Sequence, residues 1–463
     1  MSSNQNNVYV LGVGMCKFLK PRLTRFYTEM AFEAGVKAML DAGVTYDDVQ
    51  AGIGCFCVGD TCRAQRCFYQ FGMTGIPMYN TNNACATGST GLNMARNFVK
   101  GGIHDCVLVI GFEQMQPGPL GGNVTGAPKM PNSGDLRIKM LSETHGLKQA
   151  PPNPQQFGNA GVEYMEKYGA TARDFAEIAR VSHEHSSRNP YAQFQDVYTL
   201  EQIEQSPMIY YPITKLQCSP TSDGAGAAVI VSQKFLDARP ELKAHAVLMA
   251  GQSLATDTPE HYNRSAMSLV GYDMTGRAAK AALNEAKVSI DDVKVVELHD
   301  CFSTNELITL EGLGLCEKGK AHHLVRNGDI TYGGRVVVNP SGGLISKGHP
   351  LGATGLAQCA ELTWQLRGWA NNGRLVKDID VALQHNLGLG GCVVITVYKR
   401  ADGKKNTDIP IDEATIAKRS GLGYNPATAA RYITRAQAET VMSKKAPCAF
   451  ATDNTIDLIE ARL

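Results

Sequence analysis

A cysteine at the start of a helical segment is the first residue in the sequence that could do chemistry. Cys85 lies in residues 82–89, Asn-Asn-Ala-Cys-Ala-Thr-Gly-Ser, which follow a strand-like run and open a helix that continues to Val99. Free backbone N–H groups and the positive end of a helix stabilise a thiolate, so we expect a lowered pKa and a nucleophilic thiol. The same N–H groups could hold an oxyanion. A buried core cysteine is the alternative, because small residues surround it.

An internal repeat pairs this cysteine with a histidine. At an offset of 264, residues 88–92 (Gly-Ser-Thr-Gly-Leu) align with residues 352–356 (Gly-Ala-Thr-Gly-Leu), and Cys85 then aligns with His349. Pro350 suits the first position of a helix. Two equivalent helix starts would therefore present a thiol and an imidazole to one cleft. A capping or core histidine is the alternative.

A second histidine and a second cysteine follow a predicted strand. Residues 299–306 (His-Asp-Cys-Phe-Ser-Thr-Asn-Glu) come directly after the apolar run 295–298. The C-terminal edge of an open α/β sheet is where binding sites gather. His299 and Cys301 can both exchange a proton, as acid–base catalysis requires, and a structural role is the other possibility.

A glycine-rich turn completes the set of candidate clusters. Residues 384–391 (Gln-His-Asn-Leu-Gly-Leu-Gly-Gly) predict a strand that ends in a turn with exposed N–H groups. His385, Asn386, Leu387 and Gly388 are therefore candidates for an oxyanion site or for the lining of the cleft. A phosphate-binding loop is excluded, because no Gly-Lys-Ser or Gly-Lys-Thr follows.

The elements that must position these clusters alternate between strand and helix. Apolar runs typical of strands recur at residues 8–11, 107–110, 228–231, 295–298 and 392–395. With helical patterns between several of them, they favour mostly parallel sheets covered by helices. A second repeat, at an offset of 244, aligns residues 39–42 and 44–49 with residues 283–286 and 288–293. The sequence therefore predicts a duplicated α/β unit.

A long irregular stretch interrupts the first half of this pattern. It is rich in Pro, Gly and polar residues and contains short predicted helices at residues 160–168 and 174–185. Insertions of this kind often build substrate sites. The expected domains are an N-terminal half (1–115 and 223–240), an inserted loop domain (116–222), a C-terminal half (241–400) and an extension (401–463).

The composition argues against several classes of protein. The chain has 45 basic and 44 acidic residues, a net charge of +1, and no block of like charge, so we expect no binding of nucleic acid. No apolar run approaches the length of a membrane helix. The 13 cysteines fit reduced thiols inside a cell better than disulfides. No metal is expected, because the only local cluster lacks the spacing of zinc ligands: Cys55, Cys57, Cys62 and Cys67.

In their order and spacing, the four clusters resemble the thiolase superfamily, and within it the sterol carrier protein X type of peroxisomal thiolase. The resemblance covers roughly residues 8–400. Residues 83–89 resemble the nucleophile segment and residues 348–350 the Gly-His-Pro motif. Residues 299–302 read His-Asp-Cys-Phe, where other thiolases usually carry Asn-Glu-Ala-Phe. This substitution is the mark of the subfamily. Many thiolases carry a second catalytic cysteine in a Cys-x-Gly motif. Residues 385–387 read His-Asn-Leu at that position.

The resemblance implies both a fold and an activity. The fold would be two duplicated βαβαβαββ halves in a five-layer α-β-α-β-α sandwich, with an inserted loop domain. The activity would be that of a 3-ketoacyl-CoA thiolase in lipid metabolism. Such an enzyme cleaves a 3-oxoacyl-CoA with CoA through an acyl-cysteine, or runs the reverse Claisen condensation. Acyl-CoA and CoA would be substrates, no cofactor would be needed, and a homodimer is expected.

The resemblance also assigns roles to four residues. Cys85 would be the nucleophile, and His349 would be the base that activates it and a donor to the enolate oxygen. His299 would be the second donor to that oxygen. Cys301 would supply the acid/base thiol that is missing at residues 385–387.

Other functions stay open for the same clusters. A decarboxylating ketoacyl synthase would use Cys85, His299 and His349 on the same fold but would have no need of Cys301. A catalytically silent lipid- or CoA-binding protein would keep the fold while its site decays. A Cys-His hydrolase would not explain the duplication.

The last three residues carry a hypothesis about location. Ala461, Arg462 and Leu463 resemble a variant of the Ser-Lys-Leu peroxisomal address. They predict a peroxisome or a similar organelle, with the peroxisomal import receptor as a partner. The cytoplasm is the alternative.

Overall fold

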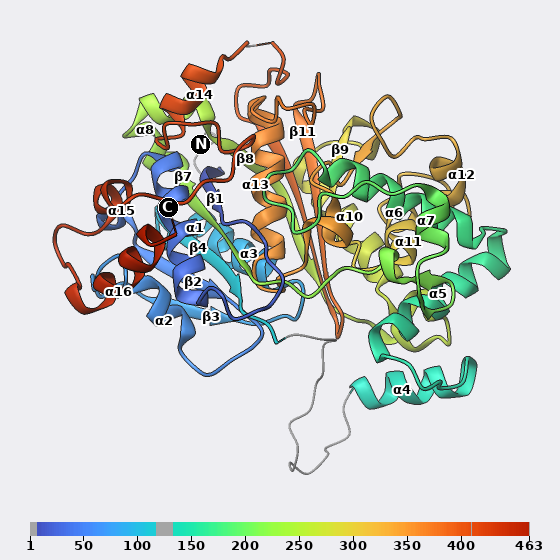
Figure 1. Ribbon diagram of the computed structural model, residues 1–463. Helices are drawn as coiled ribbons and strands as arrows, with labels where there is room; N and C mark the ends of the chain where they lie inside the picture. Colours follow the sequence, from blue (N-terminus) through green and yellow to red (C-terminus); the bar gives the residue numbers. More distant parts are fainter. Residues whose placement is uncertain (1–6, 117–132, 409, 463) are drawn as a thin grey trace.

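Ten strands form one mixed sheet in the computed structural model, which describes residues 7–116, 133–408 and 410–462 (Figure 1). The strand order is β10-β9-β11-β12-β8-β1-β7-β4-β2-β3. The strands are β1 (Val8–Met15), β2 (Ala51–Cys55), β3 (Met78–Thr81), β4 (Cys106–Glu113), β7 (Gly224–Ser232), β8 (Val247–Ala255), β9 (Val295–Glu297), β10 (Val337–Val338), β11 (Val381–Gly388) and β12 (Cys392–Arg400). A separate ribbon pairs β5 (Met208–Tyr210) with β6 (Ile213–Thr214).

The sheet consists of two halves with the same plan. From the centre outward, the N-terminal half runs β1-β7-β4-β2-β3 and the C-terminal half runs β8-β12-β11-β9-β10. The halves meet where Tyr9 and Val10 of β1 pair with Leu248 and Val247 of β8. This arrangement confirms the duplication that the two sequence repeats predict.

The expectation of mostly parallel sheets is wrong. β2 is parallel to β3 and β4, and β9 is parallel to β10 and β11. β7 and β12, however, run antiparallel to both of their neighbours. The reason is clearest at β12, because only residues 389–391 separate it from β11 and so short a connection can join only antiparallel strands.

Helices form three layers around the two halves of the sheet. α3 (Thr87–Lys100) and α13 (Thr354–Arg367) lie between the halves, where they contact each other and strands of both (Figure 1). α1 (Tyr27–Ala42) and α2 (Arg63–Phe68) cover the outer face of the N-terminal half, and α10 (Tyr272–Ala286) covers that of the C-terminal half. The chain therefore has the five-layer α-β-α-β-α fold. α13 is buried along its whole length, as a helix between the two halves of the sheet must be.

The offset of 244 reappears as two equivalent turns. The short helical turns Tyr46–Asp48 and Ile290–Asp292 follow α1 and α10, and each is closed by a capping box. The side chains of Thr45 and Asp48 form the first box, and those of Ser289 and Asp292 form the second. The same local sequence therefore follows α1 in one half and α10 in the other.

The segment between β4 and β7 carries helices of its own. They are α4 (Ser133–Thr144), α5 (Pro152–Tyr168), α6 (Ala172–Ser186) and α7 (Leu200–Glu204). The predicted helices at residues 160–168 and 174–185 are confirmed, because they lie within α5 and α6. Both helices pack against α11 (Ser303–Gly312) of the C-terminal half, which places the segment beside the loop that follows β9.

The segment after β12 packs against the N-terminal half. It contains α14 (Glu413–Arg419), α15 (Arg435–Val441) and α16 (Ala449–Glu460), and the last two contact α1. Ile433, Ile456 and Ile459 share a hydrophobic core with α1. Arg462 Nε lies 2.7 Å from the buried carboxylate of Glu29. Leu463, the last residue of the predicted address, lies outside the described residues.

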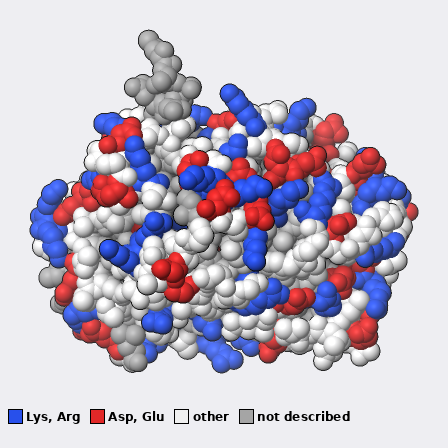
Figure 2. Space-filling model, turned by 90° about the horizontal axis from the view of Figure 1, so that it is seen from above, with Lys and Arg blue, Asp and Glu red and all other residues white. Residues whose placement is uncertain are grey.

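The remaining elements are short, and the surface mixes both signs of charge. They are α8 (Gln233–Asp237), α9 (Ala266–Leu269), α12 (Ala321–Arg326), the 3-10 turns Lys215–Gln217, Pro240–His245 and Pro259–Tyr262, and the π-helical turn Gly343–Lys347. Figure 2 shows basic and acidic side chains interspersed over one face of the molecule. Among the described residues, no helix combines the length and apolar character that crossing a bilayer requires.

Candidate active site

One cavity of about 380 Å³ brings the four predicted catalytic residues together. Cys85 reaches it from the start of α3, His349 from the turn before α13, and His299 and Cys301 from the loop after β9. The rest of its lining is mainly apolar and includes Met115, Phe157, Ile209, Phe302, Leu387 and Leu389. An apolar chamber with a few convergent polar groups is the usual form of a small-molecule site.

Cys85 precedes α3 on a strained turn. Ala84 has a left-handed backbone with φ of 49°, which is costly for any residue with a Cβ. The hydroxyl of Thr87 holds this turn, since it donates to Ala84 O at 2.6 Å and accepts from Asn83 N at 2.7 Å. Cys85 follows this turn directly, and its side chain lines the cavity.

The expectation of a lowered thiol pKa is wrong. Burial, and to a smaller extent the nearby carboxylate of Glu113, raise the pKa of Cys85 to about 12. The sequence shows the helix end but not the desolvation, and here desolvation dominates. In the free protein Cys85 is therefore a neutral thiol, which needs a base before it can attack.

Glu113, at the end of β4, is a site residue that sequence reasoning missed. Its carboxylate accepts hydrogen bonds from Cys57 N (3.1 Å), Val58 N (3.0 Å) and Gly352 N (3.1 Å). It therefore ties a loop of the N-terminal half to the start of α13. Burial raises the pKa of Glu113 to about 7. No motif marks this residue, because its partners are backbone groups from distant segments.

His349 presents a free lone pair. Its Nδ1 lies 2.7 Å from Thr354 Oγ1, and that hydroxyl donates to Pro350 O at 3.1 Å. The hydroxyl must therefore accept from His349, so Nδ1 carries the proton. Nε2 is buried and has no partner among the described residues. Burial, and to a smaller extent the charge of Lys347, lower the pKa of His349 to about 3, so the imidazole is neutral.

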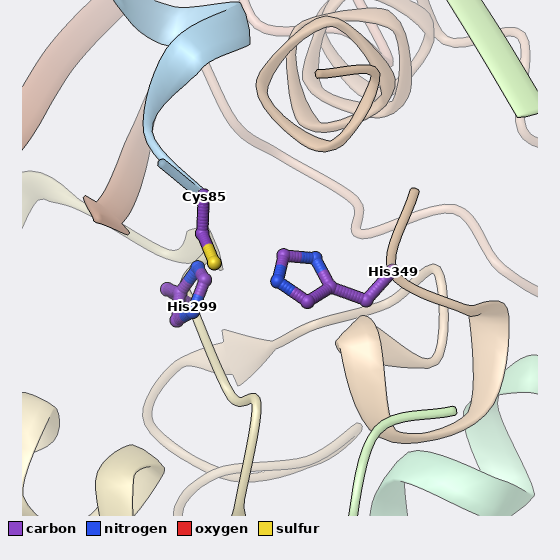
Figure 3. A group of neighbouring side chains, drawn as sticks. All are labelled: Cys85, His299 and His349. Atoms are coloured by element: carbon purple, nitrogen blue, oxygen red, sulfur yellow. The ribbon is translucent and has the colours of Figure 1, made fainter. Parts of the chain in front are cut away.

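The thiol and the two imidazoles form one compact group. Cys85 Sγ and one ring nitrogen each of His299 and His349 all lie within 4.8 Å of one another (Figure 3). The two rings meet edge to face, with centroids 5.0 Å apart. Among the described residues, this is the one such group of metal-ligand type. The limit of 4.8 Å exceeds the roughly 2.6–3.2 Å that direct proton transfer requires, so sulfur and nitrogen must approach each other when substrate binds.

Cys301 lies in the same cavity but is deeply buried. Burial raises the pKa of its thiol, and the neighbouring Cys85 and Asp300 raise it further. Asp300 turns away from the cavity and accepts from Leu344 N (2.6 Å) and Ile345 N (3.4 Å). The motif 299–302 therefore has two functions: it places His299 and Cys301 in the cavity lining, and it anchors the π-helical turn before His349.

The prediction for residues 385–388 is only partly right. Leu387 lines the cavity, whereas His385, Asn386 and Gly388 are not part of its lining. His385 Nδ1 accepts from His299 N at 3.2 Å, and its Nε2 lies 3.1 Å from Thr275 Oγ1. The side chain is committed to α10 and to the backbone of the next loop, so it cannot also reach the cavity.

A segment before β7 links the two catalytic loops and was also missed. Ser219 N donates to Cys301 O at 2.9 Å, and Ser222 Oγ accepts from His349 N at 2.9 Å. Cys218 lines the cavity as a third thiol. The only signal in the sequence is a run of turn-forming residues, Cys-Ser-Pro-Thr-Ser-Asp-Gly, directly before a strand.

The fold and the site together define a class of protein. A duplicated five-layer α/β fold that sets a cysteine and a histidine at two equivalent helix starts is the thiolase fold. The chain belongs to the thiolase family: residues 15–234 match the family model described as Thiolase, N-terminal domain, and residues 256–398 match Thiolase C-terminal domain-like.

Named relatives place the chain within this family. It is 50% identical over 399 residues to Sterol carrier protein 2 of Bos taurus, a match that covers 85% of this chain and 72% of the relative. It is 33% identical over 404 residues to an Acetyl-CoA acetyltransferase of Methanothermobacter thermautotrophicus, covering 85% and 100% of the two chains.

Solved structures share the fold at lower identity. The Ltp2-ChsH2(DUF35) aldolase matches with a TM-score of 0.70 at 21% identity, covering 86% of this chain and 99% of the other. Human mitochondrial 3-ketoacyl-CoA thiolase in complex with CoA matches with a TM-score of 0.62 at 19% identity, covering 85% and 98%.

Proposed function

We propose that the protein is a 3-ketoacyl-CoA thiolase that forms an acyl-cysteine at Cys85. The observation that carries the proposal is the free lone pair of His349, which shares a compact group with the Cys85 thiol in a cavity that Cys301 also lines. A nucleophile beside an oriented neutral base is the arrangement that covalent catalysis requires. A second thiol in the same chamber supplies the acid that carbon–carbon cleavage needs.

The first half-reaction breaks the bond between C2 and C3 of the substrate. His349 Nε2 takes the proton of Cys85 as the sulfur attacks C3 of a 3-oxoacyl-CoA. Because burial raises the pKa of Cys85 and lowers that of His349, we expect the proton to leave sulfur during the attack and not before it. Collapse of the adduct leaves an acyl group on Cys85 and releases an enolate of the shorter acyl-CoA. His299 and the now protonated His349 donate to its oxygen, and Cys301 protonates its carbon.

The second half-reaction frees the enzyme. The Cys301 thiolate takes the proton of CoA, whose sulfur attacks the thioester at Cys85. Cys85 leaves and recovers its proton from His349, so every group returns to its starting state. Because the first product departs before CoA attacks, ping-pong kinetics are expected. The condensation follows the same path in reverse.

The remaining parts of the proposal concern substrates, assembly and location. CoA and acyl-CoA are the substrates and no cofactor takes part. The apolar lining suits an acyl chain, and the name of the acetyltransferase relative supports transfer between CoA thioesters. A homodimer is the proposed assembly. A peroxisome is the proposed location, on the resemblance of residues 461–463 to an import address.

Thiolysis with matched cysteine variants tests the proposal. Acetoacetyl-CoA and a longer 3-oxoacyl-CoA are mixed with CoA and the wild type, Cys85→Ala, Cys301→Ser or Cys218→Ser. We expect both Cys85→Ala and Cys301→Ser to lose activity, while intact-mass measurement still finds an acyl group on Cys301→Ser. Cys218→Ser, a change of the third thiol in the cavity, is the control and keeps most activity. A wild type that cleaves no chain length would refute the proposal.

A decarboxylating ketoacyl synthase is the second candidate. The Cys85, His299 and His349 group favours it, since that chemistry needs one thiol and two imidazoles. Malonyl-CoA distinguishes the two. A synthase releases carbon dioxide from it without a second thiol acid, so Cys301→Ser would then stay active.

A further inference from the structure

We infer that Asn386 is a positioning residue: it holds His299 with its proton on Nε2, so that this imidazole can only donate a hydrogen bond to the cavity. The inference deepens the proposed thiolase reaction and rests on it for the task given to His299. A series of buried hydrogen bonds runs through Gln384, Ser89 and Asn386, and each bond fixes the direction of the next.

The series of hydrogen bonds begins at a backbone carbonyl oxygen. One end of the Gln384 side-chain amide lies 2.7 Å from Gly355 O. A carbonyl oxygen can only accept, so this end of the amide is Nε2 and the other end is Oε1. The hydroxyl of Tyr398 donates to that Oε1 at 2.6 Å, in agreement with this orientation.

The hydroxyl of Ser89 determines the orientation of the Asn386 amide. Ser89 Oγ lies 2.9 Å from Gln384 Nε2, from which it accepts, and 2.9 Å from one end of the Asn386 amide. The serine proton must therefore point to Asn386, and the atom that receives it is Oδ1. The other end of the amide, Nδ2, then faces His299.

Asn386 fixes the tautomer of His299. Asn386 Nδ2 lies 3.2 Å from His299 Nδ1, and an amide nitrogen can only donate, so Nδ1 holds a lone pair. Burial and the neighbouring imidazoles hold the pKa of His299 well below its usual range, so the ring is neutral and carries a single N–H. That N–H is at Nε2. Since Nδ1 is engaged with Asn386, Nε2 is the nitrogen left for the cavity that His299 lines.

The two histidines of the site are thereby held in opposite tautomers. Thr354 keeps the proton of His349 on Nδ1, and Asn386 keeps that of His299 on Nε2. In the resting protein, His349 Nε2 can accept the proton of Cys85 but has no proton to donate to a ligand. His299 can stabilise an oxyanion but cannot deprotonate the thiol. The different roles of the two histidines therefore follow from their hydrogen-bond partners and not from their distances to Cys85.

The network is buried, so its members are shielded from bulk water. Ser89, Gln384, Asn386 and Tyr398 are fully buried, and His299 is 1% exposed. Gly355 has room for the crossing side chains only because it lacks a Cβ, which would lie 2.3 Å from Ser89 Oγ and 2.8 Å from Asn386 Oδ1. If one of these buried amides or hydroxyls turned its proton the other way, that proton would find no other acceptor.

This arrangement also bears on metal binding. Cys85, His299 and His349 are spaced like the ligands of a Zn²⁺ ion, but a protonated Nε2 on His299 cannot bind one. An aspartate in place of Asn386 would accept from Nδ1, move the proton there and turn a lone pair of Nε2 to the cavity. A carboxylate behind a metal-binding histidine is the usual support of a zinc site.

The first test reads the tautomer directly. ¹⁵N-histidine-labelled wild type is compared with His299→Gln, which identifies the signals of His299. Nδ1 should show the shift of an unprotonated nitrogen and Nε2 that of a protonated one. The reverse pattern would overturn the inference, whether or not the protein is a thiolase. A protein with the expected tautomer but no thiolysis would refute only the proposed reaction.

The second test uses Asn386→Asp and Zn²⁺ alone. We expect kcat to fall about 10²- to 10³-fold, as on loss of one oxyanion donor. We also expect Zn²⁺ to slow iodoacetamide alkylation of Cys85 at a concentration at least about tenfold lower than in the wild type. Asn93→Asp, the same change on α3 outside the site, is the control and should match the wild type in both assays. Equal Zn²⁺ sensitivity of Asn386→Asp and wild type would contradict the inference.

A third variant tests the inference even if Asn386→Asp does not fold. Ser89→Ala removes the link that orients Asn386 without adding charge. If Asn386→Asp does not fold, Ser89→Ala should still show a mixture of both His299 tautomers in the labelled protein. Retention of a single Nε2-protonated form would mean that Ser89 and Asn386 do not set it.

Discussion

His349 Nδ1 lies 2.7 Å from the hydroxyl of Thr354, and that hydroxyl is itself committed to Pro350 O. The contact joins the candidate base to the first residue of the helix that follows it. It leaves His349 Nε2 without a proton, which is the state that a base for Cys85 requires.

Thr354→Val tests this relationship with almost no change of shape. Without the acceptor, the His349 proton can move to Nε2, and the base is lost for part of the time. We expect kcat for thiolysis to fall by about 10- to 100-fold, the usual cost of removing a group that orients a functional histidine.

The matched control for this change is Thr363→Val on the same helix. The Thr363 hydroxyl is buried like that of Thr354, but Thr363 lies nine residues further along α13 and is not part of the cavity lining. Both variants lose one buried hydroxyl, so equal losses of activity would show that the effect is structural and not tautomeric.

Glu113→Gln should make the Cys85 thiol more reactive in the free enzyme. The Glu113 carboxylate raises the pKa of Cys85, so removing its charge lowers that pKa and increases the thiolate fraction at a given pH. Alkylation by iodoacetamide at pH 8 should speed up by as much as about tenfold, the effect of a fall of one pKa unit. An unchanged alkylation rate across pH 7 to 9 would show that the charge of Glu113 does not reach the sulfur.

The sequence predicted the chemistry of the site better than its electrostatics. The offset of 264 placed Cys85 and His349 at equivalent helix starts, because duplicated segments keep their local sequence signals. The pKa of Cys85 moved opposite to the prediction, because desolvation depends on what packs over the turn. Asn386 was assigned to the cavity lining, yet it acts one layer behind it. Its contacts with Ser89 and His299 span 297 and 87 residues of sequence, and no local pattern records them.

The two central helices touch at glycines, which leads to a packing prediction. A Cβ at Gly88 would lie 2.7 Å from Gly352 O and 3.1 Å from Gly355 N, both rigid backbone atoms. Gly88→Ala should therefore push α3 from α13, destabilise the protein by about 1–3 kcal/mol and lower kcat, because Cys85 and His349 move apart.

Gly276→Ala on α10 is the comparison for this effect. A Cβ there meets nothing closer than Gly312 O at 3.5 Å, so helix propensity alone should stabilise the protein by about 0.5–1 kcal/mol. Urea denaturation at pH 7 measures both variants. A Gly88→Ala variant as stable and active as Gly276→Ala would show that the helices can separate without cost.

Glu285 links α10 to α3 and makes stability depend on pH. Its carboxylate pairs with Arg96 (2.8 Å) and Lys100 (2.6 Å) and accepts from Gln252 N (2.8 Å), and these contacts lower the pKa of Glu285 to about 2. A depressed acid stabilises the fold above its unfolded pKa of about 4.3, and this contribution is lost as the pH falls towards 2. Because the side chain is 31% exposed, solvent screening reduces the expected gain to about 1–2 kcal/mol.

Glu285→Gln should therefore lower the free energy of unfolding at pH 7 by that amount and reduce its decline between pH 5 and pH 3. Urea denaturation at pH 7, 5 and 4 follows the change while the wild type is still folded. Glu439→Gln, an exposed position on α15, provides the same loss of charge without these partners and should match the wild type at each pH. If Glu285→Gln loses as much stability at pH 4 as at pH 7, relative to wild type, the loss comes from packing, and the ion pairs to Arg96 and Lys100 contribute nothing measurable.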